Sequence, residues 1–173
     1  YGFPESHAAS FALLAYDSSW LKCHEPECFL AAMLNSQPMG FYSPSQLVQD
    51  ARRHGVEVLP VDATVSDWDC VLEKSKNLNR QDAKRNENRN GPTDNDSSSL
   101  ATGEPAVRLG LRMISGFSEI TAERILAARR ESPFDSIEDM ARRARLDRRD
   151  LKLLASAGAL RSLSDHRRLA HWE

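Results

Sequence analysis

The residues with the clearest chemical capability surround a tight turn at Gly116, Phe117 and Ser118. Gly116 can take the positive φ that other residues avoid, and Ser118 is predicted to cap the start of a helix. Such a turn leaves free backbone N–H groups at the positive end of a helix dipole, where they can hold a phosphate group. Contacts of this kind position a nucleic-acid duplex without reading its sequence. The turn therefore predicts a site for the backbone of duplex DNA.

Two helices must hold this turn, and both are predicted within residues 109–130, LGLRMISGFSEITAERILAARR. The first helix is short and closes at Met113 and Ile114. The second is amphipathic, because its apolar residues recur at helical spacing. Its apolar face consists of Ile120, Ala122, Ile125 and Leu126, and the arginines around it are Arg124, Arg129 and Arg130. The stretch is thus a predicted helix-hairpin-helix, in which Arg112 and Arg124 add positive charge beside the phosphate.

Ordinary helix packing is the alternative explanation of this pattern. Any two short amphipathic helices joined through a glycine show apolar residues on both sides of it. Ser118 also stands where such a hairpin prefers a second glycine, and Glu119 and Glu123 place negative charge close to the expected phosphate.

A second, degenerate hairpin is predicted in GALRSLSDHRR, residues 158–168. Gly158 ends a helix that starts at or beside Asp147, and another helix is expected to start at Ser164. Its outward residues would be His166, Arg167 and Arg168. We count these three residues and Gly158 as DNA-binding, together with Arg112, Gly116, Phe117, Ser118 and Arg124.

The charge of the chain is unevenly distributed. Residues 1–73 hold 3 Lys or Arg against 10 Asp or Glu, whereas residues 105–173 hold 14 against 10. Only the last part is suited to hold phosphates. The chain begins at Tyr1 without a leading apolar run, so we expect a piece of a larger cytoplasmic polypeptide, with no signal peptide and no membrane span. Three cysteines without a framework of spacings fit a reducing compartment.

Two other groups of residues are candidate metal ligands. Cys23, His24 and Cys28 resemble half of a zinc site, but no second pair of ligands follows. Asp67 and Asp69 would share one face of a strand and could hold a divalent ion, although acidic residues near turns are usually solvated. We predict no metal ligand and no catalytic residue in this chain.

The remaining elements are predicted to be mainly helical. Residues 6–24 are too apolar all round for a surface helix, so we expect a buried helix with Ser6 as its N-cap. A second helix covers residues 26–34, and Ser43 opens a third that Gly55 ends. Residues 56–59 are a short strand. The residues of the first helix expected to be buried are Phe11, Leu14, Trp20 and Leu21.

Residues 74–104 are predicted to be a disordered insertion. Among them just four are apolar, which cannot offset the entropy of ordering. The flanking residues 68–72 and 106–111 are expected to pair as the two strands of a small β-hairpin. The predicted fold is mainly α: a helical part with this β-hairpin, followed by a tandem helix-hairpin-helix domain in residues 105–173.

The chain resembles the bacterial C-family DNA polymerases, which are relatives of the DNA polymerase III alpha subunit. The resemblance is carried by Pro-Glu-Ser before His7, NSQPMGFYSPSQLV, DWDCVLE, AVRLGLRMISGF and LLASAGALRSLSDHRR. The first three of these match the error-prone, translesion branch. The resemblance covers nearly everything except residues 74–104.

This resemblance implies that residues 1–73 are the C-terminal part of a fingers domain and that the hairpins bind duplex DNA. The catalytic carboxylates and their Mg²⁺ would lie in a palm domain upstream of Tyr1, so the fragment itself should not polymerise DNA and needs no cofactor. Ser6 and His7 match a segment near the incoming deoxynucleotide; for His7, a place in the first turn of a helix is the alternative. Asp67 and Asp69 match a non-catalytic stretch.

The predicted function is that of a fragment of an error-prone DNA-directed DNA polymerase, acting in translesion synthesis and DNA repair. Through the parent protein it would also meet a sliding clamp and accessory translesion proteins. One alternative is a free-standing helix-hairpin-helix DNA-binding protein. The other is a structural or docking module that does not bind DNA.

Overall fold

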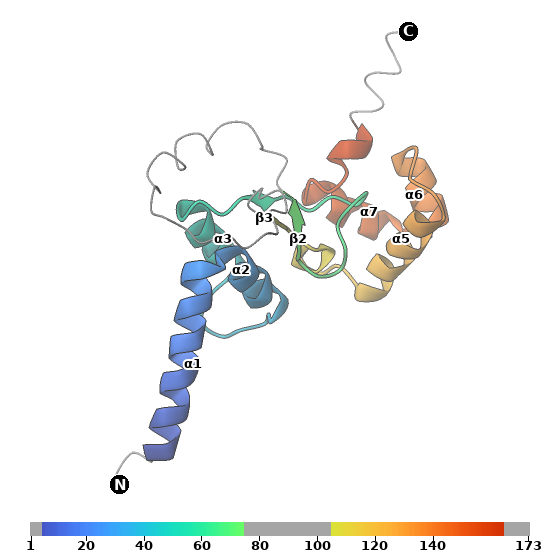
Figure 1. Cartoon of the computed structure of the whole chain (residues 1–173). Coiled ribbons are helices and arrows are strands. Elements are labelled where there is room, and N and C mark those ends of the chain that lie inside the picture. The colour runs from blue at the N-terminus through green and yellow to red at the C-terminus, as the bar shows by residue number, and fades with distance from the viewer. Residues whose placement is uncertain (1–4, 75–104, 165–173) are drawn as a thin grey trace, which may run out of the picture.

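The computed structural model describes residues 5–74 and 105–164, which form a mainly helical fold around a small central sheet (Figure 1). The predicted fold class is confirmed. The N-terminal helices α1 (Glu5–His24), α2 (Pro26–Asn35) and α3 (Pro44–Arg53) lie to one side of the sheet. On the other side lie α5 (Glu119–Glu131), α6 (Ile137–Arg143) and α7 (Arg148–Ser156).

The sheet has three short strands in the order β1-β3-β2. β3 (Pro105–Arg108) is parallel to β1 (Val58–Leu59) and antiparallel to β2 (Val71–Lys74). The predicted pairing across the insertion is confirmed, although both strands are shorter than expected. Lys74, which was expected in the insertion, ends β2 and pairs with Pro105. Residues 75–104, expected to be disordered, lie outside the described residues.

The helix ends are set by local sequence. Ser43 and Gln46 form a capping box at the start of α3, which satisfies two backbone N–H groups. His54 ends that helix and Gly55 follows with a φ of +90°. Pro26 occupies the first turn of α2, where its missing N–H costs nothing. These predictions for the second and third helices are confirmed.

The predicted burial of the first helix is wrong. In α1, exposure is 58% for Phe11, 59% for Leu14, 47% for Trp20 and 43% for Leu21. The helix projects from the end of α2, and no other described element packs along its length (Figure 1). Its apolar composition was correctly recognised, but composition does not supply the neighbours that burial requires. The helix also begins at Glu5, so Ser6 lies inside it and is not the N-cap.

Two hydrophobic cores hold the other elements together. One packs α2 against the sheet through Leu30, Leu34, Val56, Val58, Cys70 and Val107. The other fills the C-terminal part and includes Leu111, Phe117, Ile125, Met140, Leu154 and Leu160. Leu109 and Met113 pack against both cores, so the C-terminal helices are fixed to the sheet rather than tethered to it.

Candidate nucleic-acid interface

The first predicted hairpin is present as a turn between a short helix and a long one. The 3₁₀ helix η2 (Leu111–Met113) leads into Gly116, which has a φ of +74°. Phe117 follows and is buried in the core, and its N–H donates to the carbonyl of Ile114 at 3.1 Å. Ser118 is the N-cap of α5, as predicted. The glycine therefore reverses the chain while the next residue anchors the turn.

The start of α5 leaves its backbone donors open. The side chain of Ser118 makes no capping hydrogen bond. Within the described residues, the N–H groups of Ser118, Glu119 and Ile120 have no acceptor. By contrast, the side chains of Ser43, Ser136 and Asp147 cap α3, α6 and α7. The open amides thus point out of the turn with the positive end of the α5 dipole behind them.

A second turn of the same kind follows α7. Gly158 has a φ of +70°, and Ala159 is fully buried with its N–H donating to the carbonyl of Leu154 at 2.9 Å. The next helix begins at residue 161, not at the predicted Ser164. The N–H groups of Leu160, Arg161 and Ser162 find no acceptor in the part of the chain that the structure describes. Both turns therefore place a positive-φ glycine, a buried residue and an uncapped helix start in sequence.

Several predicted site residues make contacts within the protein or lie outside the described residues. Arg112 pairs with Asp69 at 2.6 Å and also donates to the carbonyl of Gln37. Arg124 donates to the carbonyl of Arg145 at 2.8 Å and to Thr121 Oγ1 at 3.0 Å. Both guanidinium groups are thus engaged inside the protein, and their contact with DNA stays a prediction. The predicted DNA-binding residues His166, Arg167 and Arg168 lie outside the described residues.

The apolar face predicted for α5 needs one correction. Thr121, Ala122, Ile125 and Ala128 are buried, but Ile120 is 70% exposed. Phe117 and the core of the C-terminal part set the buried face, which turns Ile120 outward beside the open amides.

Other basic residues, most of which the sequence analysis did not single out, surround the C-terminal helices. Each is exposed and makes no ion pair with another described residue. They are Arg130, Arg145, Arg148, Arg149, Lys152 and Arg161. The density of basic residues between positions 142 and 161 was the signal that could have identified all of them except Arg130. Arg148 and Lys152 are one helical turn apart, an arrangement of like charges that favours an anionic partner.

The acidic residues weighed as metal ligands instead hold arginines. Asp67 Oδ1 lies 2.7 Å from an amino group of Arg129, and Asp69 Oδ1 pairs with Arg112. Across residues 5–74 and 105–164, no three His, Cys, Asp or Glu side chains lie together as a metal site. Cys23 and Cys28 are exposed free thiols. Burial raises the pKa of the third thiol, Cys70, and donation from the Gly110 N–H to its sulfur opposes that rise.

The N-terminal part has fewer features that point to a ligand. His7 is exposed near the start of α1, and its ring lies 4.4 Å from that of Phe11, centroid to centroid. No helix of the described residues is long and apolar enough to cross a membrane.

Comparisons with known proteins agree with this geometry. The family model for the helix-hairpin-helix motif matches residues 55–170. The chain is similar over its whole length to proteins named error-prone DNA polymerase. Those from Methylococcus capsulatus, Azoarcus sp. and Pseudomonas fluorescens are 58%, 59% and 57% identical to it. The chain spans 16%, 14% and 15% of the length of these relatives. The predicted hairpin unit and the predicted resemblance to error-prone DNA polymerases are confirmed.

Proposed function

The chain belongs to the helix-hairpin-helix motif family, and on that premise we propose that its two hairpins hold the phosphate backbone of duplex DNA. The observation that carries this proposal is the repeated turn at Gly116 and Gly158, each followed by a buried residue and an uncapped helix start. Main-chain N–H groups can donate to any phosphate, so binding does not depend on base sequence.

Charge on the C-terminal helices supports the same assignment. Arg148, Arg149 and Lys152 on α7 and Arg161 after Gly158 are exposed and free of ion pairs with described residues. They would neutralise phosphates and release counterions from the duplex. The open amides give the contact its geometry, and these side chains give it most of its attraction at a distance.

For the longer polypeptide we propose error-prone DNA synthesis past lesions, in the service of DNA repair in the bacterial cytoplasm. The support is the name of the relatives and the full coverage of this chain by them. This chain would contribute duplex binding, with Ser6 and His7 near the incoming deoxynucleotide. Metal-dependent chemistry would belong to other parts of that polypeptide, and a sliding clamp and accessory proteins would also meet it there. Nucleotide misincorporation by the longer polypeptide on damaged templates tests this wider proposal.

The duplex-binding proposal is tested by measuring the affinity of the chain for two duplexes of unrelated sequence over a range of salt concentrations. We expect equal affinities and a linear fall of log K with log salt, with a slope of about −0.9 per neutralised phosphate. Lys152→Gln should make that slope shallower by about 0.9, because it removes one phosphate contact.

Arg53→Gln is the matched control. Arg53 is also exposed and basic, but it ends α3 on the acidic side of the molecule. A preference for one duplex, or equal effects of the two substitutions, would contradict the proposal. The absence of salt-dependent binding would favour a docking module.

A further inference from the structure

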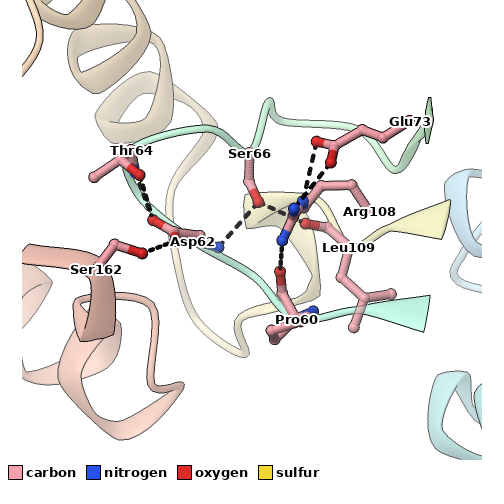
Figure 2. Close-up of polar contacts among 8 residues, drawn as sticks. All are labelled: Pro60, Asp62, Thr64, Ser66, Glu73, Arg108, Leu109 and Ser162. Atoms are coloured by element: carbon pink, nitrogen blue, oxygen red, sulfur yellow. Dashed lines mark hydrogen bonds and ion pairs between the residues drawn. The ribbon is translucent and has the colours of Figure 1, made fainter. Parts of the chain in front are cut away.

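The loop between β1 and β2 holds the second hairpin directly. The N–H of Ala63 donates to the carbonyl of Ala159 at 2.8 Å, one residue after Gly158. Ser162, in the first turn of the following helix, donates its hydroxyl to Asp62 Oδ2 (Figure 2). The other oxygen of Asp62 accepts from the N–H and the hydroxyl of Thr64, at 2.9 and 2.7 Å. The Asp62 carboxylate is therefore held by its own loop through one oxygen and contacts the hairpin through the other.

The same loop also holds the first hairpin, from both of its helices. The N–H of Leu111, in η2, donates to the carbonyl of Asp67 at 2.8 Å. Arg129, in α5, donates to the carbonyl of Ser66 at 2.8 Å and to Asp67 Oδ1 at 2.7 Å. Residues 61–69 thus make hydrogen bonds to both hairpins, and we call this segment the bracket.

The bracket itself has little freedom to move. Ser66 is fully buried; its hydroxyl donates to the carbonyl of Leu109 at 2.9 Å and accepts from the N–H of Asp62 at 3.0 Å (Figure 2). A Cβ placed on Gly110 would overlap the main chain of Trp68 and Asp69, so the two segments are in direct backbone contact. Beside it, Arg108 makes two hydrogen bonds to Glu73 and one to the carbonyl of Pro60, which ties the start of the bracket to the sheet.

We propose that the bracket sets the distance and angle between the two phosphate-binding turns, with Asp62 and Ser162 as positioning residues. This inference rests on the proposed function, because the spacing has meaning only if both turns contact one duplex. Two sites held rigidly apart engage a second phosphate without a new cost of ordering. A loose second hairpin would lose that advantage even though its own amides were intact.

The charge of Asp62 allows an electrostatic role to be distinguished from a positioning role. Asp62→Ala removes a negative charge, which by electrostatics alone would strengthen binding to DNA. If Asp62 instead positions the second hairpin, the substitution weakens binding. Ser162→Ala removes the same hydrogen bond without changing the charge. Asp17→Ala, on the exposed surface of α1, is the matched control for charge.

The experiment measures duplex affinity against salt for the whole chain and its Asp62→Ala, Ser162→Ala, doubly substituted and Asp17→Ala variants. We expect each single bracket substitution to lower affinity about tenfold and to flatten the salt slope by about 0.9, the loss of one phosphate. The double variant should be no worse than Asp62→Ala alone, because Asp62→Ala already removes the hydrogen bond that Ser162→Ala removes. Unchanged slopes in folded Asp62→Ala and Ser162→Ala would overturn the bracket while leaving duplex binding in place.

A second measurement does not depend on DNA. Nitroxide labels are attached to the variants Ser115→Cys and Ser156→Cys and report the distance between the two turns. The exposed Cys23 and Cys28 are replaced by serine, and Cys70 is buried. We expect one narrow distance distribution in the parent and a broad one in Ser162→Ala. Equal widths would overturn the proposal. A broad distance distribution in Ser162→Ala, together with no salt-dependent DNA binding by the parent, would support the role of the bracket and contradict the proposed function.

Discussion

Arg143 of α6 contacts the C-terminal end of α5 through several hydrogen bonds. Arg143 reaches back to the end of α5, where it donates to the carbonyls of Ala128, Ser132 and Pro133. It also pairs with Asp139 and lies over the ring of Phe134, 5.0 Å from its centroid. Ser132 is the C-cap residue of α5 and Pro133 follows it, so the guanidinium fork caps the C-terminal end of the helix.

Arg143→Lys should therefore destabilise the fold by about 1–3 kcal/mol, because one ammonium cannot satisfy several carbonyls at once. The measurement is urea-induced unfolding. Arg142→Lys is the control, since Arg142 pairs with the same Asp139 but its side chain is 80% exposed. Equal losses in the two variants would show that the cap has no special role.

At the scale of elements, the pairing of β2 with β3 predicts that the long polar insertion is dispensable for folding. Lys74 and Pro105 are cross-strand partners, so residues 75–104 leave and return at neighbouring strands. Replacing them with Asn-Gly should leave the melting temperature nearly unchanged, because loop closure costs about 0.6 kcal/mol per doubling of length. Differential scanning calorimetry of the shortened chain checks this. A fall of many degrees would mean that the insertion packs on the fold.

Most helix ends could be predicted from the sequence, because they depend on neighbouring residues. Ser43 with Gln46, Pro26 and Gly55 each act within one turn of the chain. The start of the last helix was misplaced because Ser164 has the features of an N-cap, whereas the helix begins three residues earlier.

Burial and side-chain partners could not be predicted in the same way, because they depend on contacts between distant segments. The exposure of α1 reflects which neighbours reach it, not its own composition. The partners of Arg112, Arg129 and Asp62 lie 43, 62 and 100 residues away along the chain. The two glycine turns were predicted, whereas the contacts of residues 61–69 with both of them were not.

At the scale of the whole chain, the distribution of charge suits the proposed binding of a duplex by the C-terminal helices. Residues 1–73 hold 3 basic against 10 acidic residues, and residues 105–173 hold 14 against 10. Both glycine turns and the unpaired basic residues of α7 belong to the second group. A duplex approaching the acidic side would be repelled, so the C-terminal helices are where it would be held. Because the acidic part opposes binding, we expect the chain by itself to bind weakly.

The most direct test of this account compares the duplex affinity of Gly116→Val and Gly55→Val with that of the parent across salt concentrations. Both glycines have positive φ, and neither Cβ would meet another atom within 4 Å, so the two substitutions strain the backbone alike. We predict that both variants lose stability, by roughly 1–2 kcal/mol. Only Gly116→Val should also bind roughly tenfold more weakly and with a shallower salt slope. Parent-like binding by folded Gly116→Val, or an equal loss in Gly55→Val, would contradict the claim that the hairpins hold DNA.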